Sequence, residues 1–93
     1  MPPRRTPAYV YVLGCVTSTR HLTYVGWTSD LVRRLKQHND GKGARSTRGR
    51  VWVLLYSELC AGKREAMSRE WHLKRDRAFR RHLAGALVTA GPA

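Results

Sequence analysis

The chain has 93 residues with an apolar fraction of 42%, which suits one compact domain and leaves no room for a second. Its 18 lysines and arginines stand against 6 acidic residues, a formal charge of +12. This composition excludes a disordered tail, and in the absence of a long apolar run it favours a nucleic acid over a membrane surface as the partner.

The cysteines and histidines argue against a disulfide framework and against a structural zinc site. Cys15 and Cys60 lie far apart without a CxxC motif, and no signal-peptide pattern follows Met1. Reduced thiols and a cytoplasmic location are therefore expected. The four histidines show neither the H-E-x-x-H pattern nor zinc-finger spacing.

Three of the four prolines fall in the first eight residues, which predicts a loose N-terminal segment over residues 1–8. We expect one domain over residues 9–87. A C-terminal tail over residues 88–93 is expected to fray.

Three apolar runs predict strands. Tyr9–Val16 is aromatic and β-branched, and both of its faces are apolar enough for a central strand. The polar run Thr17–His21 predicts a hairpin loop, so that Leu22–Trp27 pairs antiparallel with the first strand and brings its tyrosine toward the tyrosines there. Gly26 closes this second strand, and the missing Cβ lets backbone or a ligand come close. The continuous run Val51–Ser57 predicts a third strand, buried on both faces.

A basic helix is predicted over residues 30–39, after oxygen-bearing residues of the kind that cap a helix. Leu31 and Leu35 form its apolar stripe. Three polar residues recur every four positions on a neighbouring face and could line a site: Asp30, Arg34 and His38.

The segment Asn39–Arg50 combines glycines with several cations and has no apolar residue except Ala44. This pattern predicts a mobile loop that contacts phosphate groups. A solvated linker is the alternative interpretation.

A second helix is predicted over residues 63–74, with an apolar arc made by Ala66, Met67, Trp71 and Leu73. At about 100° per residue, Glu70 falls inside this arc, about 40° from Ala66. A carboxylate aimed at the core is costly unless a cation, a hydrogen-bond donor or a metal receives it. Glu70 is therefore either the partner of an arginine or lysine, or a metal ligand.

A further amphipathic helix is predicted over residues 76–87. Its inward residues are expected to be Phe79, Leu83 and Leu87, and its outward residues Arg77, Arg80 and Arg81. The outward face is either solvated or binds an anion.

Only Glu70 among the acidic residues has an inward placement, so a two-metal site finds weak support. One carboxylate can still hold a Mg²⁺ ion that keeps most of its waters. Hydrolysis of a phosphodiester also needs a base and a cation, and tyrosine and arginine can fill these roles. Because the ordinary pKa of tyrosine is near 10, neighbouring cations or a metal would have to assist it.

With these residues in view, the chain resembles the GIY-YIG endonuclease superfamily, in particular its small stand-alone bacterial members of the UPF0213 type. Tyr9-Val-Tyr11 stands where the family has GIY, and Tyr24-Val-Gly26 stands where it has YIG. Arg34, ten residues past Tyr24, matches the family's catalytic arginine. The resemblance covers about residues 9–81.

The later motifs of the family are also matched. His38 stands where many members have histidine or tyrosine, and Lys42-Gly-Ala with Thr47 resembles the loop of the junction-cleaving branch. The run from Glu65 to Glu70 resembles the helix whose glutamate holds the single divalent metal.

The resemblance implies an α+β fold, a small three-stranded antiparallel sheet flanked by helices. It implies an endonuclease that uses one Mg²⁺ or Mn²⁺ ion to hydrolyse DNA, with RNA as another possible substrate. A membrane is not expected as a partner. The implied catalytic residues are Tyr11, Tyr24, Arg34, His38 and Glu70, with Glu70 as the metal ligand. The implied DNA-binding residues are Arg33, Lys36, Lys42, Arg45, Thr47, Arg48, Arg50 and Lys74.

In the implied scheme one tyrosine, assisted by His38, activates water, and the choice between Tyr11 and Tyr24 is open. Tyr9 and two valines replace the glycine and isoleucines of the family motifs without touching the reactive groups. No separate specificity domain fits in the chain, so we expect branched, single-stranded or distorted DNA as substrate, with low sequence specificity and room for a protein partner. The alternatives are a nucleic-acid-binding module with little turnover, and a protein that docks on RNA or an acidic partner.

Overall fold

The computed structural model describes residues 6–16 and 22–89, and the side chains of these residues up to residue 85. The expected terminal segments therefore fall largely, and the hairpin loop Thr17–His21 wholly, outside the described residues. No helix in the described ranges is long and apolar enough to cross a membrane.

The sheet has the predicted antiparallel three-stranded form. Its strands are β1 (Ala8–Cys15), β2 (Thr23–Thr28) and β3 (Trp52–Cys60), in the order β2-β1-β3. The central β1 is buried along almost its whole length, because it has a neighbour on each side and helices on both faces. The prediction of a central first strand is confirmed.

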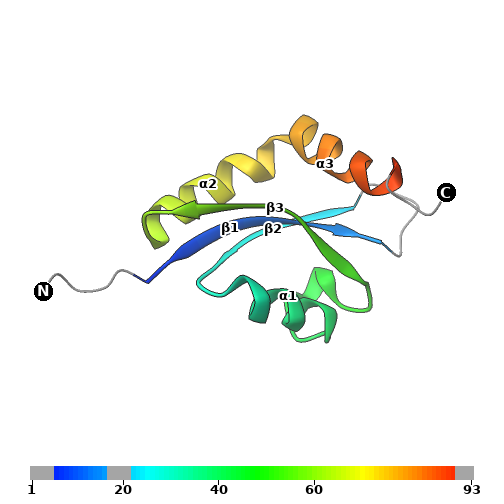
Figure 1. Cartoon of the computed structure of the whole chain (residues 1–93), viewed down its shortest axis with the longest axis horizontal. Coiled ribbons are helices and arrows are strands. Elements are labelled where there is room, and N and C mark those ends of the chain that lie inside the picture. Colours follow the sequence, from blue (N-terminus) through cyan, green and yellow to red (C-terminus); the bar gives the residue numbers. More distant parts are fainter. Residues whose placement is uncertain (1–5, 17–21, 90–93) are drawn as a thin grey trace, which may run out of the picture.

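Helices cover both faces of this sheet, so the protein has three layers (Figure 1). Helix α1 (Leu31–Asn39) and the short 3₁₀ helix η1 (Arg45–Thr47) lie on one face, and α2 (Lys63–Arg75) and α3 (Arg77–Thr89) lie on the other. The alternation of β1 divides the core accordingly: Val10 and Val12 pack toward α2 and α3, while Tyr11 and Leu13 pack toward α1. The α+β class expected from the sequence is confirmed.

The third strand differs from its prediction. It runs to Cys60 and forms an edge of the sheet, and two of its apolar side chains are largely exposed, Leu54 at 41% and Leu59 at 65%. The expectation of burial on both faces was wrong because a continuous apolar run does not reveal that the sheet ends at that strand.

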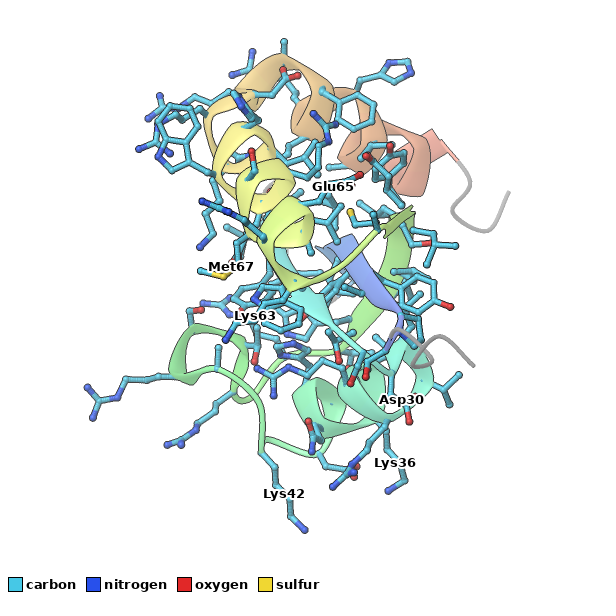
Figure 2. The ribbon with its side chains drawn as sticks, turned by 90° about the vertical axis from the view of Figure 1, so that its left-hand side faces the viewer. Asp30, Lys36, Lys42, Lys63, Glu65 and Met67 are labelled. Carbon is cyan, nitrogen blue, oxygen red and sulfur yellow. The ribbon has the colours of Figure 1, made fainter. Side chains whose placement is uncertain are left out.

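The apolar arc predicted for α2 was also partly wrong. Met67 and Trp71 are about half exposed, and Met67 projects from one side of α2 while Glu65 projects from the other (Figure 2). The inward stripe is spaced i, i+3, i+4, i+7 and consists of Ala66, Arg69, Glu70 and Leu73. Two polar residues sit in its middle because each has a charged partner: Arg69 Nε donates to Glu58 on β3 at 2.9 Å, and Glu70 pairs with Lys74.

The last helix begins with a side-chain cap, since Asp76 Oδ1 accepts a hydrogen bond from Phe79 N at 3.1 Å. Phe79 and Leu83 pack on the core as predicted, whereas the side chain of Leu87 lies outside the described residues. Arg80, predicted to face outward, instead joins three segments of the chain. It donates to the carbonyl oxygens of residues 73 and 74 and to Thr23 Oγ1 on β2.

The segment between α1 and β3 is pinned rather than free. The Asn39 side chain donates to Trp52 O at 2.9 Å and accepts from Trp52 N at 2.7 Å. The Trp52 indole donates to Thr47 O at 2.9 Å, and Thr47 itself is fully buried. The linker interpretation does not hold for residues 45–47, which form η1.

Candidate active site

A tyrosine on the central strand and a histidine on α1 meet below the sheet. The Tyr11 hydroxyl lies 2.9 Å from His38 Nε2, and the two residues are 2% and 0% exposed. Their side chains reach each other because Tyr11 points toward the α1 layer and His38 lies on the inward side of that helix.

Glycine is required opposite this pair. Tyr11 faces Gly26 across the β1–β2 ladder, and a Cβ at residue 26 would lie 2.6 Å from the Tyr11 hydroxyl oxygen. The close approach predicted for Gly26 is thus made by the Tyr11 side chain, which lies over the glycine. Gly43 plays the same part on the other side of the site, since a Cβ there would collide with the His38 ring.

Thr47 sets the hydrogen-bonding direction of His38. The Thr47 hydroxyl donates to Ala44 O at 2.8 Å and lies 2.8 Å from His38 Nδ1. Its single proton is used by the carbonyl oxygen, so Nδ1 must donate to Thr47 Oγ1. The unprotonated Nε2 then accepts from the Tyr11 hydroxyl, and the chain of donors runs from Tyr11 through His38 and Thr47 to Ala44.

Burial keeps this histidine neutral. Desolvation, with a smaller contribution from the Arg34 charge, lowers the pKa of His38 to about 4. At neutral pH its Nε2 is therefore unprotonated, and its lone pair accepts the hydrogen bond from the Tyr11 hydroxyl.

The pKa of Tyr11 is raised in this state. Desolvation by burial is the main cause, hydrogen bonding from Arg34 opposes it, and the charges of Tyr24 and Glu70 raise it slightly further. Tyr11 consequently holds its proton at neutral pH, and it can accept another proton only if its own moves to Nε2 in the same event.

Tyr24 completes an aromatic group around His38. Its ring centroid lies 4.8 Å from that of His38 and 6.3 Å from that of Tyr11. It is only partly buried, so it lies between the buried Tyr11–His38 pair and solvent. The predicted approach of the two tyrosines is confirmed.

Arg34 links the tyrosines to an open pocket. Hydrogen bonding to Tyr11 is the largest cause of its raised pKa, and its Nη1 donates to Gln37 Oε1 at 3.1 Å. A pocket of about 330 Å³ lies beside it, lined by Arg33, Arg34, Gln37 and the segment Trp27–Asp30 that precedes α1. The guanidinium therefore lies between the buried pair and an open pocket that has room for a phosphate group.

Glu70 lies on α2, the helix that packs along β1 and β2 on the other face of the sheet. Its carboxylate acts electrostatically on Tyr11, its side chain is 21% exposed, and its Oε1 lies 3.0 Å from Lys74 Nζ. Within the described residues no three His, Cys, Asp or Glu side chains form a metal cluster. A single carboxylate with access to solvent fits a hard divalent ion that retains its waters, provided that Lys74 turns aside.

Most of the predicted DNA-binding cations lie on the surface of the α1 layer, whereas Lys74 lies on α2. Arg33, Arg45, Arg48 and Arg50 are exposed, and Lys36 and Lys42 project from this layer into solvent in Figure 2. Lys36 is held by Asp40 at 2.8 Å, and Lys74 by Glu70.

Thr47 is the member of that predicted set whose placement disagrees with a DNA contact. It is 0% exposed, and its hydroxyl is used by His38 and Ala44. Its part in orienting His38 was missed from the sequence, as was the hydrogen bond that Arg34 donates to Gln37. The i, i+3 spacing of Gln37 and the glycine at residue 43 were the available signals.

Several known proteins are similar to this chain. A family model described as "GIY-YIG catalytic domain" matches residues 7–83. UPF0213 protein CPE1444 of Clostridium perfringens is 48% identical over 68 residues, which are 72% of this chain and 70% of the relative. UPF0213 protein SAG0778 of Streptococcus agalactiae is 52% identical over 67 residues, 71% of this chain and 73% of the relative. The solution NMR structure of UPF0213 protein BH0048 from Bacillus halodurans is 36% identical, with a TM-score of 0.48, covering 92% of this chain and 88% of that one.

Proposed function

The chain belongs to the GIY-YIG family of nuclease domains, and from that premise we propose that it is a metal-dependent endonuclease that hydrolyses DNA phosphodiester bonds. The observation that carries the proposal is the directed hydrogen-bond chain from Tyr11 through neutral His38 to Thr47, with Arg34 beside it. This arrangement can move a proton away from an attacking water and can stabilise an oxyanion.

Tyr11 acts as the base of this site, with His38 as the acceptor of its proton. A water proton passes to the Tyr11 hydroxyl oxygen as the Tyr11 proton passes to His38 Nε2, so no free phenolate has to form. The hydrogen bond of 2.9 Å between the Tyr11 hydroxyl and His38 Nε2 supports Tyr11, rather than Tyr24, for this role. Tyr24 borders the water side of the pair and positions the phosphate.

Arg34 stabilises the negative charge that develops on the phosphate oxygens. Its guanidinium is already turned toward the Tyr11 hydroxyl, so it needs little reorganisation when the phosphate enters. The increasing negative charge also raises the proton affinity of His38, which its burial lowers in the resting protein.

Glu70 would hold the single Mg²⁺ or Mn²⁺ ion, which would supply positive charge to offset the negative charge that develops during cleavage. Lys74 forms an ion pair with Glu70 in the free protein. Its side chain is more than half exposed, so it can turn into solvent and contact the substrate backbone. The exposed cations of the α1 layer hold the nucleic acid by its phosphates, whereas the buried Thr47 makes no such contact.

The substrate is proposed to be branched, single-stranded or otherwise distorted DNA, with RNA as a second possibility. Contacts of the proposed kind are made to phosphates and carry no base sequence information. A protein partner would supply further specificity.

Cleavage of a panel of DNA structures in Mg²⁺ or Mn²⁺ tests this proposal. We expect Tyr11→Phe, Arg34→Ala and Glu70→Ala each to lower the single-turnover rate by about 10²-fold or more. Tyr56→Phe and Glu65→Ala are matched controls, because Tyr56 bonds to Glu58 away from the site and Glu65 accepts a hydrogen bond from Ala61 N, just before α2. Undiminished cleavage in the first three variants would refute the assignment.

A nucleic-acid-binding module with little turnover is the second candidate. Two observations favour it. Lys74 pairs with Glu70, the carboxylate that would hold the metal, and the raised pKa of Tyr11 keeps the proposed base protonated. Tight, salt-dependent binding without cleavage in either metal would select this function.

A further inference from the structure

A second basic pocket lies outside the site described above. It measures about 190 Å³ and is lined by Thr23 at the start of β2 and by three arginines of α3: Arg77, Arg80 and Arg81. None of these residues was among the cations predicted to bind DNA.

The central arginine of this pocket is held rigidly. Arg80 Nε and Nη2 donate to the carbonyl oxygens of Leu73 and Lys74, and Nη1 donates to Thr23 Oγ1 at 3.1 Å. Its hydrogen-bond partners among the described residues are uncharged, so none of them compensates its positive charge in this partly buried position.

The other two arginines add to this charge instead of offsetting it. Arg77 and Arg81 are exposed and one helical turn apart, and the ion pairs within the described residues involve none of the three arginines. The adjacent acid, Asp76, has its Oδ1 engaged by the Phe79 amide as the cap of α3. Three cations around one hollow repel each other, and an anion bound there would relieve that repulsion.

The position of the pocket relates it to the candidate active site. Thr23 also lines a neighbouring pocket of about 250 Å³ together with Tyr24, Ser46 and Arg50. At the other end of β2, Thr28 lines the pocket beside Arg34. Cationic hollows therefore lie at both ends of this edge strand, with Tyr24 between them.

We infer that a nucleic-acid strand lies along β2 and that the pocket of Arg77, Arg80 and Arg81 binds a backbone phosphate separate from the one at Arg34. The six residues of β2 span about 16 Å at about 3.3 Å per residue, which separates the two phosphates by several nucleotides. In this arrangement the fixed Arg80 lines the pocket, and the exposed Arg77 and Arg81 contact the phosphate. The inference rests on the proposed function only for the identity of the ligand.

Salt-dependent binding in EDTA tests the inference without cleavage. The probe is a fluorescently labelled single-stranded DNA of about 20 nucleotides, longer than the binding sites of most single domains of this size. The double variant R77Q/R81Q leaves Arg80 and its structural bonds intact, and its thermal unfolding is measured alongside. The charge control is R64Q/R75Q, which removes two exposed charges from α2 at residues that line none of the pockets named above.

Loss of one phosphate contact lowers the slope of log K against log salt by about 0.7, which is about a fivefold weaker affinity at 0.1 M salt. We expect this change in R77Q/R81Q and less than half of it in R64Q/R75Q. An equal change in the two double variants would show a response to net charge alone and would overturn the inference.

A second measurement locates the phosphate. Single phosphates of the probe are replaced in turn by neutral methylphosphonates, and the affinity of each modified probe is measured. The position at which the replacement no longer weakens binding is identified for R77Q/R81Q and for Arg34→Ala, and the two positions are compared. We expect two positions separated by several nucleotides, and coincident positions would overturn the inference. Because neither measurement requires turnover, an inactive protein with two phosphate sites would refute the proposed function alone.

Discussion

At the scale of single residues, the candidate active site depends on one buried neutral histidine. His38 donates from Nδ1 to Thr47 and accepts at Nε2 from Tyr11, and both directions follow from the single proton of the Thr47 hydroxyl. A histidine held by two such bonds has a defined tautomer before any substrate arrives. Its environment also makes the stability of the protein depend on pH.

Acidification is expected to destabilise the fold through His38. The pKa of this residue is lowered by burial from 6.5 to about 4, so between these values the unfolded chain binds a proton that the folded protein does not. The stabilisation is complete above pH 6.5 and is lost as the pH falls toward 4, with about 2 kcal/mol lost between pH 7 and pH 5. Glu58 and Asp40, whose pKa values are lowered by Arg69 and Lys36, act at lower pH than this window.

Urea unfolding at a series of pH values measures this loss. In His38→Gln the free energy of unfolding should vary less between pH 5 and pH 6.5, even if the variant is less stable at every pH. A ¹⁵N NMR titration of the unmodified protein gives a second reading. It should show His38 protonated on Nδ1 alone at pH 6, and a doubly protonated ring at that pH would contradict the assignment.

At the scale of elements, α1 brings the site together. Its cap Asp30 accepts from Arg33 N, its inward residue His38 reaches the sheet, and Arg34 projects one turn earlier toward the pocket at its N-terminus. The short β2 matters in the same way, because Gly26 leaves space for the Tyr11 ring. The geometry of the site thus depends on how well α1 is fixed at its first turn.

Replacing the cap of α1 should separate stability from binding. We expect Asp30→Ala to lower the free energy of unfolding by about 1 kcal/mol, because Arg33 N loses its side-chain acceptor. Affinity for single-stranded DNA should not fall, since the change removes a carboxylate from the pocket that Arg33 and Arg34 line. Chemical denaturation and fluorescence anisotropy measure the two effects.

Asp40→Ala is the matched control at the other end of α1, where the exposed aspartate pairs with Lys36. It makes the same change of charge and should cost less stability. A loss of DNA affinity in Asp30→Ala that exceeds the loss in Asp40→Ala would count against a phosphate in that pocket.

At the scale of the whole molecule, the charge of +12 has two opposite consequences. The cations repel each other in the compact state, and the same cations attract a nucleic acid. Both effects weaken as salt is added, because the screening length falls from about 30 Å at 0.01 M to about 10 Å at 0.1 M.

Added salt should therefore stabilise the free protein while it weakens DNA binding. From about 0.01 M to 0.1 M NaCl we expect the unfolding midpoint to rise and the DNA association constant to fall, with a log–log slope near −4 if about six phosphates are contacted. Thermal unfolding without DNA and anisotropy with it are the two measurements. A midpoint that falls with salt would mean that ion pairs outweigh the repulsion.

The sequence predicted a large part of the site because the relevant signals are local. The face of the strand on which Tyr11 lies follows from the two-residue period of a strand, and the shared face of Arg34 and His38 follows from helical spacing. Gly26 is visible in the sequence as the one residue of its strand without a side chain. Those residues do meet in the structure, and the family resemblance is confirmed by the match over residues 7–83. Their chemical roles remain proposals that the variants above test.

The errors arose where a long-range partner decided the outcome. Met67 and Trp71 satisfied an apolar pattern but are about half exposed, because Arg69, which pairs with Glu58 on β3, takes a place in the inward stripe. Arg80 belonged to an outward basic face by periodicity, yet it is held by Thr23, 57 residues earlier in the chain. Periodicity assigns a face to each residue but cannot identify the group that it will meet there.

The sequence by itself determined the antiparallel hairpin of β1 and β2, the basic character and the residues available for chemistry, because these depend on composition and on neighbours close in the chain. Only the tertiary structure decided which tyrosine bonds to His38, that Thr47 orients that histidine from within the core, and that α3 builds a second basic pocket at the end of β2. These features depend on contacts between segments distant in sequence, whose distances and desolvation are set only when the three layers pack together.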